Sequence, residues 1–398
     1  MSTARTDPLE HLAAELDALD RDGLVVEERI LDGPTGARTV VDGRAVINLA
    51  SNNYLGLANH PRLNEAAAAA ALELGAGTAA VRTIAGTFAI HRELERRFAD
   101  FKHAASALLF QSGFTSNAGT VAAILGPDDV IVSDRLNHAS IVDGARLSRA
   151  QIRVYEHADA GHADALLSEG ARDGRRQLLI TDGVFSMDGD IAPLPDLVAA
   201  AERHGAIMMV DDAHATGVLG AGGAGSVDHF GLAGRVDIQV GTLSKAIGVL
   251  GGFIAGPQHL TRWLRNRGRP YLFSTSAPPP VAAACLAALD VIADEPDRLR
   301  RLWANTERFK AGLASLGFDT GASATPITPV ITRDEVATQG FAARLFDAGV
   351  FAPAIVFPTV ARSAARVRTI VTAAHTDADL DEALAAFGAV GRELGLLD

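Results

Sequence analysis

The sequence has little cysteine, a deficit of positive charge and no long apolar run. Cys285 is the only cysteine among 398 residues, which excludes a disulfide framework and a thiolate metal cluster. The longest apolar stretch, residues 66–72, is alanine-rich and far too short to span a bilayer. No apolar signal core follows Met1. We therefore expect a cytoplasmic protein that does not associate with membranes.

Charge and hydropathy narrow the class of protein further. The formal net charge of −12 argues against a nucleic-acid partner and against an anionic membrane surface. Hydrophobic residues make up 48% of the chain and charged residues 21%, so we expect a large packed core instead of disorder.

The centre of the chain alternates between short apolar runs and helical segments. Most of these runs are short and apolar throughout, as in strands that are buried on both faces. Helical segments such as 164–172 and 196–204 lie between them, which predicts an α/β fold with a mostly parallel sheet covered by helices. The expected strands are 107–110, 130–133, 152–155, 178–181, 207–210, 238–240 and 252–255.

Other elements are expected before this sheet. Leucines at helical spacing predict an amphipathic helix over 8–24, and its apolar face must dock on something. Two β-type runs joined by Asp42-Gly43 predict a hairpin over 39–47. An alanine-rich helix is expected over 64–74.

The composition changes after the three prolines at 278–280. A single long helical stretch is expected over 281–316, followed by β segments at 328–332 and 366–371 and a helix over 377–396. We predict three units: an N-terminal helix and hairpin over 1–50, a large domain over 51–282 and a smaller α+β domain over 283–398.

Polar residues gather where the expected strands end. In an open parallel sheet, ligands bind at the carboxyl ends of the strands. Here the segments that follow the expected strands are rich in Ser, Asn, Asp, His and Lys. These segments are 111–117, 134–140, 182–189, 211–214 and 242–245. This accumulation predicts a ligand site at that edge of the sheet.

Lys245 is the most informative residue of these segments. It follows the apolar run that ends at Val240, where burial would lower the pKa of its amine and make it a nucleophile. Asp211 and His214 follow a neighbouring run. An amine, a carboxylate and an imidazole at adjacent strand ends are what a pyridoxal 5'-phosphate (PLP) enzyme needs. The lysine holds the aldehyde, and the carboxylate keeps the pyridine nitrogen protonated.

Each of these residues also has a structural interpretation. Lys245 alone could be a solvated surface charge, although the glycines at 251–252 favour a close backbone approach. Asp211 could cap the following segment, but Asp212 is the better cap and leaves Asp211 for a buried role. His138 could be a core histidine that bonds a backbone carbonyl.

Three further patterns have competing interpretations. Ser112, Gly113 and Phe114 lie at a strand-to-helix turn and could offer N–H groups to a phosphate, or form an ordinary turn. Residues 220–225 match G-x-G-x-x-G, but they do not follow a strand directly and 226–231 open a helix poorly, so we expect a flexible loop. A metal site at 211–214 is disfavoured, because adjacent strand residues point to opposite faces.

Together these segments resemble the α-oxoamine synthases, PLP enzymes of fold type I that condense an amino acid with an acyl-CoA. The resemblance runs from Ser-Asn-Asn-Tyr-Leu-Gly at 51–56 to Arg-Val-Arg at 366–368 and Ala-Ala-His-Thr at 373–376. Its most specific motifs are Asn-His-Ala-Ser at 137–140, Gly-Val-Phe-Ser-Met-Asp-Gly at 183–189, Val-Asp-Asp-Ala-His at 210–214 and Thr-Leu-Ser-Lys at 242–245.

The resemblance implies roles for the catalytic residues. Lys245 looks like the lysine that holds PLP and removes the Cα proton, and Asp211 would pair with the pyridinium nitrogen. His138 would stack on the ring, and His214 would bond its phenolic oxygen.

The resemblance also implies binding residues and a homodimer with shared active sites. Thr242 and the backbone of Ser112, Gly113 and Phe114 would hold the phosphate, and Ser186 would contact cofactor and substrate. Ser274 or Thr275 would reach the phosphate of the partner subunit. Asn53 and Arg368 would bind the substrate carboxylate, with Arg366 as the competing candidate on the same strand face.

Four branches of the family are open: glycine C-acetyltransferase, 8-amino-7-oxononanoate synthase, 5-aminolevulinate synthase and serine palmitoyltransferase. Val81 before Arg82, and the segment 262–274, resemble the first branch. Residues 190–195 and Ser244 also occur in the second, which joins L-alanine to a pimeloyl thioester with loss of the carboxylate. We favour glycine with acetyl-CoA. An aminotransferase or lyase of the same fold is the interpretation from another class.

Overall fold

The computed structural model describes residues 7–21, 24–25, 28–172 and 175–397. Helix α1 (Glu10–Arg21) lies within the expected helix, of which residues 22 and 23 lie outside the described part. Strands β1 (Arg38–Val41) and β2 (Arg44–Asn48) form the expected hairpin. Its turn residues Asp42 and Gly43 have positive φ angles of 49° and 74°. A two-residue hairpin turn requires positive φ at both positions to match the twist of its strands.

The expected strands form one seven-stranded sheet with the order β3-β9-β8-β7-β6-β4-β5. Only β9 runs antiparallel to its neighbours, so the mostly parallel sheet is confirmed. The strands are β3 (Ser106–Phe110), β4 (Val130–Asp134), β5 (Gln151–Tyr155), β6 (Gln177–Asp182), β7 (Ile207–Asp211), β8 (Ile238–Thr242) and β9 (Gly252–Gly256).

Helices cover both faces of this sheet, which is why most of its strands carry apolar residues on both faces. Successive residues of β6 show the alternation: Leu178 and Ile180 pack in one core cluster, and Leu179 packs in another. The first face carries α4 (Gly113–Ile124), α5 (Ala139–Ser148), α9 (Gln258–Arg267) and α10 (Arg269–Phe273). The other carries α3 (Ala89–Phe101), α6 (Ala160–Arg172), α7 (Leu194–His204), α8 (Ser226–His229) and α11 (Pro279–Asp294), with α2 (Pro61–Leu74) packed on α11.

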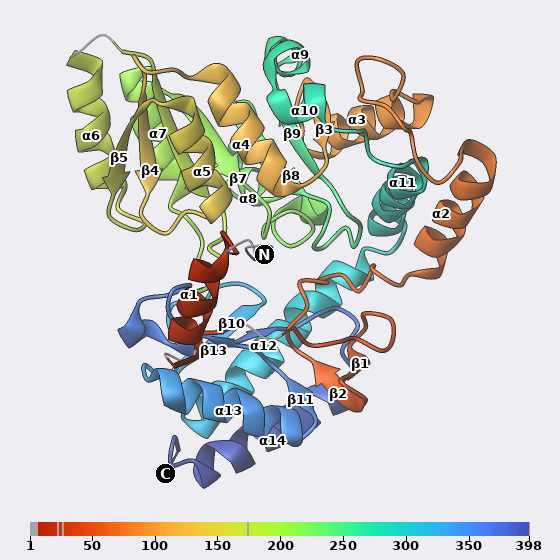
Figure 1. Cartoon of the computed structure of the whole chain (residues 1–398), viewed down its shortest axis with the longest axis vertical. Helices are drawn as coiled ribbons and strands as arrows, with labels where there is room; N and C mark the ends of the chain where they lie inside the picture. Colours follow the sequence, from red (N-terminus) through yellow and green to blue (C-terminus); the bar gives the residue numbers. More distant parts are fainter. Residues whose placement is uncertain (1–6, 22–23, 26–27, 173–174, 398) are drawn as a thin grey trace, which may run out of the picture.

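A smaller α+β part follows the large sheet, and Figure 1 shows it below the sheet, with α12 leading into it. Strands β10, β13 and β12 form a second sheet, and β11 pairs in parallel with β2, so the N-terminal hairpin joins this part of the molecule. Its elements are α12 (Asp297–Leu316), β10 (Ile327–Ile331), α13 (Glu335–Asp347), β11 (Val350–Phe351), β12 (Ala354–Ile355), β13 (Arg366–Ile370) and α14 (Asp377–Glu393).

Two expectations about local structure were wrong. The helical stretch 281–316 is two helices, because Pro296 follows the end of α11 and cannot continue its hydrogen bonding. The segment 220–225 is a packed turn with a 3-10 turn at Ala221–Gly223, and residues 226–229 form the one-turn helix α8. Gly225 has a φ of 112°, and a Cβ there would overlap Asp212 and Lys102. Within the described ranges, no helix has the length and apolar content to cross a membrane.

Candidate active site

A cavity of about 190 Å³ lies at the carboxyl edge of the large sheet. It brings together every residue predicted to bind the cofactor except Ser274 and Thr275. Its lining is Ser112, Gly113, Phe114, His138, Ser140, Asp182, Ser186, Asp211, Ala213, His214, Thr242, Ser244 and Lys245. These residues follow β3, β4, β6, β7 and β8, whose parallel directions place their ends at one edge.

Lys245 follows β8 and its side chain lines this cavity. Burial lowers the pKa of its amine to about 8, against the opposing effect of the Asp211 and Asp182 carboxylates. About a tenth of the amine is therefore neutral at pH 7, far more than for a lysine with an ordinary pKa, and the neutral form is the nucleophile.

Asp211 ends β7 and is buried. Its Oδ2 accepts a hydrogen bond of 2.6 Å from Asn117 Nδ2, and its Oδ1 accepts one of 2.8 Å from the Ala213 backbone. We expected Asp212 to be the better cap of the following segment, and its carboxylate does accept hydrogen bonds from the Ser226 backbone at the start of α8. Asp212 points the other way and forms a 2.7 Å ion pair with Lys102.

His138 caps helix α5, since its Nδ1 accepts a hydrogen bond from the Ser140 backbone at 3.2 Å. The alternative of a core histidine bonded to a carbonyl does not describe it, because its ring lines the cavity. Burial is the largest cause that lowers its pKa, and the Lys245 charge acts in the same direction. The ring is therefore neutral at neutral pH.

His214 lies on the turn after β7, and its Nδ1 is 2.7 Å from the Tyr54 hydroxyl. Burial and the charges of Lys245 and Arg368 lower its pKa well below the usual range. A neutral imidazole carries one N–H, so the site can use it as a single hydrogen-bond donor.

Ser112, Gly113 and Phe114 begin helix α4, whose first N–H groups have no helical acceptors. Gly113 lies against Thr242: a Cβ on Gly113 would be 3.1 Å from Thr242 Cβ. A Cβ on Gly252 would overlap the Ser112 carbonyl, so the glycine of β9 permits the close approach that we expected from the sequence. A helix N-terminus beside a hydroxyl is suited to an anion.

The two arginines of β13 make different contacts with the loop 183–189. Arg366 is paired with Asp188 and also donates to the Met187 carbonyl at 3.0 Å. Arg368 donates to the Ser186 carbonyl at 3.1 Å, and its buried Nε has no partner among the described residues. Of the two arginines, Arg368 is thus the one with an unpaired guanidinium nitrogen, and it lines neither this cavity nor the adjoining one that contains Asn53.

Asn53 does not line the cavity that contains Asp211. It lies in an adjoining cavity of about 380 Å³, and Ser244 and Lys245 line both. Its Oδ1 accepts a hydrogen bond from Ala58 N at 3.1 Å. Asn53 is thus near Lys245 but in the adjoining cavity.

Ser274 and Thr275 lie outside both cavities, after α10. Gln111 Nε2 donates to the Thr275 carbonyl at 2.9 Å, which fixes the backbone of this segment, and the Thr275 side chain is exposed.

Sequence reasoning assigned no role to several residues of the site. Asp182 was noted only as the end of a strand. It pairs in register with Asp211 and accepts a hydrogen bond of 3.0 Å from the His138 backbone. Burial and the Asp211 charge raise the pKa of Asp182 well above its usual range. Asn117 and Tyr54 were missed because their partners lie 94 and 160 residues away.

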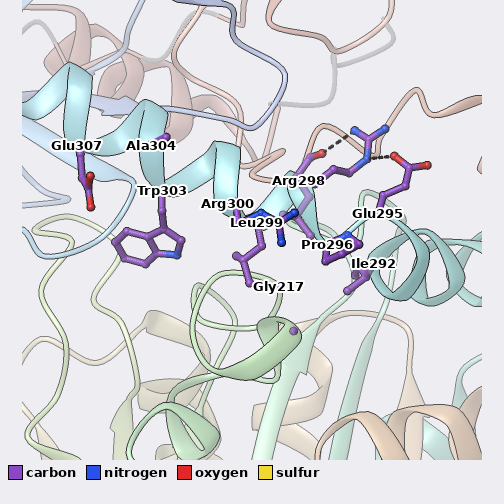
Figure 2. A pocket seen from close by; sticks show the side chains of 12 residues that line it. Gly217, Ile292, Glu295, Pro296, Arg298, Leu299, Arg300, Trp303, Ala304 and Glu307 are labelled. Carbon is purple, nitrogen blue, oxygen red and sulfur yellow. Dashed lines mark hydrogen bonds and ion pairs between the residues drawn. The ribbon is translucent and has the colours of Figure 1, made fainter.

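A larger cavity, of about 520 Å³, lies where α11 and α12 meet the turn at 217–222. Figure 2 shows that Arg298 and Glu295 in its wall are paired with each other. Arg298 also donates to the Leu55 carbonyl at 3.3 Å. None of the predicted site residues lines this cavity.

Comparisons with known proteins identify the family of this chain. The model of the aminotransferase class I and II family matches residues 44–387. An 8-amino-7-oxononanoate synthase of Symbiobacterium thermophilum is 59% identical over 386 residues, 97% of this chain and 98% of that one. Another, from Thermoanaerobacter pseudethanolicus, is 54% identical over 389 residues, 98% of each chain. A serine palmitoyltransferase from S. paucimobilis, solved as a PLP-myriocin aldimine, has a TM-score of 0.92 at 30% identity and covers 98% of this chain and 100% of its own.

Proposed function

We propose that this chain joins L-alanine to a pimeloyl thioester. The chain belongs to the α-oxoamine synthases within the aminotransferase class I and II family, and it is a PLP-dependent acyltransferase. The products are 8-amino-7-oxononanoate, carbon dioxide and the free thiol. The observation that carries this proposal is the 59% identity over 97% of the chain to a relative with that name. The relatives support this alternative better than glycine C-acetyltransferase, which we favoured from Val81 and the segment 262–274.

The residues of the cavity fit PLP at three points. The N-terminus of α4 and the Thr242 hydroxyl suit a phosphate. The buried Asp211 carboxylate, already held by Asn117, suits a protonated pyridine nitrogen. The amine of Lys245, whose pKa is about 8, suits an aldehyde.

When bound, PLP supplies an aldehyde and an electron-poor ring that accepts the electron pair released at Cα of the amino acid. Lys245 would hold the aldehyde of PLP through its Nζ, and as a neutral amine it would accept the Cα proton of the amino acid. Asp211 keeps the proton on the ring nitrogen, because its carboxylate is fixed by Asn117 and Ala213. His138 packs on the ring face as a neutral group.

Arg368 binds the carboxylate of the amino acid, since its buried Nε is free to donate. Asn53 lies in the adjoining cavity, which Lys245 also lines, and assists in holding that carboxylate. His214 donates to the phenolic oxygen of the ring. Ser186, whose carbonyl binds Arg368, connects cofactor and substrate.

A homodimer completes the site in this proposal. Thr275 is exposed outside the cavity of its own subunit. In a second copy, Ser274 or Thr275 would supply a hydroxyl to the phosphate.

We also propose that the chain is divided into the three units predicted from the sequence, over residues 1–50, 51–282 and 283–398.

The test is an assay of thiol release with glycine, L-alanine and L-serine, each combined with acetyl-, succinyl- and pimeloyl-CoA. We expect L-alanine with pimeloyl-CoA to give the highest kcat/KM, together with carbon dioxide. A preference for glycine and acetyl-CoA would overturn the substrate assignment and restore our first interpretation. Lys245→Ala, the matched negative control, should release no thiol.

A further inference from the structure

Tyr54 and His214 form a buried pair beside the proposed cofactor cavity. The Tyr54 hydroxyl lies 2.7 Å from His214 Nδ1, and the two rings meet edge to face at 82°. Tyr54 is 1% exposed, whereas His214 lines the cavity. Tyr54 is therefore outside the cavity and acts on it only through the imidazole.

The direction of this hydrogen bond follows from counting protons. Burial raises the pKa of Tyr54 above its usual range, so the hydroxyl keeps its proton. His214 is neutral, as its lowered pKa shows, and carries one N–H. If Nδ1 carried that proton and donated to Tyr54, the buried hydroxyl proton would need another acceptor. None of the described residues provides one.

The consistent arrangement has Tyr54 as donor and Nδ1 as acceptor. The ring proton is then on Nε2, the nitrogen that remains available to the cavity. The opposite tautomer would present an Nε2 lone pair to the phenolic oxygen of the cofactor, and two acceptors would face each other.

We propose that Tyr54 is a positioning residue that fixes His214 in the Nε2–H tautomer, so that His214 donates a hydrogen bond into the cofactor cavity. The proposal rests on the role of His214 in the proposed function. The backbone of Tyr54 is itself anchored, since its carbonyl accepts a 2.7 Å hydrogen bond from Ala373 N. The hydroxyl therefore has a defined position relative to the imidazole.

The test is nitrogen-15 NMR of protein with labelled histidine, which separates protonated from unprotonated ring nitrogens directly. His214→Asn assigns the signals. In the wild type, with and without PLP, we expect Nε2 to be protonated and Nδ1 to be the acceptor. In Tyr54→Phe, which keeps the ring packing, we expect a mixture of tautomers. Tyr155→Phe removes the hydroxyl of the other tyrosine with a fully buried side chain and should leave the His214 signals unchanged.

Activity provides a second readout. We expect Tyr54→Phe to lower kcat about tenfold, the effect of one hydrogen bond, and to move the pH midpoint of the bound cofactor's visible absorbance. Tyr155→Phe should move neither. A protonated Nδ1 in the wild type overturns the inference even if Tyr54→Phe fails to fold, and so does an unchanged tautomer in that variant. Either result leaves thiol release by the wild type, the test of the proposed function, unaffected.

Discussion

The ion pair between Lys102 and Asp212 makes the sharpest prediction about stability. Both side chains are 0% exposed, and Nζ lies 2.7 Å from Oδ2. Nζ also donates to the Ala224 carbonyl at 2.5 Å, and Asp212 accepts hydrogen bonds from the Ser226 backbone. The pair thus ties the end of α3 to the end of β7 and to α8, directly beside Asp211.

Lys102→Met keeps most of the buried volume and removes the charge, which leaves the Asp212 carboxylate buried without a counter-ion. Breaking such a pair costs about 3–5 kcal/mol. The Ser226 donors remain, so we expect about 3 kcal/mol. Asp212→Asn alone should also be destabilising, because it leaves the Lys102 ammonium buried. The double variant should lose less than the sum of the two single variants, since neither charge is then left unpaired.

The assay is urea unfolding of the protein without cofactor at one fixed protein concentration, because ligand and subunit binding both change apparent stability. Arg308→Met is the matched control, since its ion pair with Asp381 has side chains 43% and 58% exposed. An exposed pair of this kind contributes about 0–1 kcal/mol. The reasoning would be refuted if Lys102→Met were no more destabilising than Arg308→Met, or if the two single costs simply added.

The remaining predictions concern the site. The neutral amine of Lys245 is its reactive form, and burial lowers the pKa of this amine to about 8. The rate at which Lys245 is acylated in cofactor-free protein should therefore increase with pH up to and through pH 8 and then level off. Peptide mass spectrometry of labelled protein measures this, and a rise that continued above pH 10 would contradict it. Arg368→Lys should raise the KM for the amino acid about tenfold through loss of the bidentate fork, whereas Arg366→Lys should change it less. In Gly252→Ala the new Cβ would overlap the Ser112 carbonyl, so PLP should bind at least tenfold more weakly in a spectroscopic titration. An unchanged affinity would show that this turn does not bind the phosphate.

Elements determined by local chemistry were predictable from the sequence. The buried strands were found because β4 and β6 each contain three consecutive large apolar residues, and the hairpin was found because Asp42-Gly43 suits positive φ. The break at Pro296 was missed although the proline and the charged residues on both sides of it carried the signal.

The location of the candidate site could also be predicted in part from the sequence. Parallel strands bring their carboxyl ends to one edge, so His138, Asp211 and Lys245 could be expected to meet before any contact was known. The proposed branch of the family rests on overall similarity to whole relatives, whereas the short segment around Val81 favoured a different branch.

The sequence by itself determined the sheet, the edge at which chemistry gathers and the identity of the amine. Only the tertiary structure decided which polar groups pair: Tyr54 with His214, Lys102 with Asp212, and Arg366 instead of Arg368 with Asp188. Periodicity reports which face of an element is apolar, because that depends on near neighbours along the chain. A pairing across 110 or 160 residues depends on how packed elements are placed and on the need to satisfy every buried polar group, which no local pattern encodes.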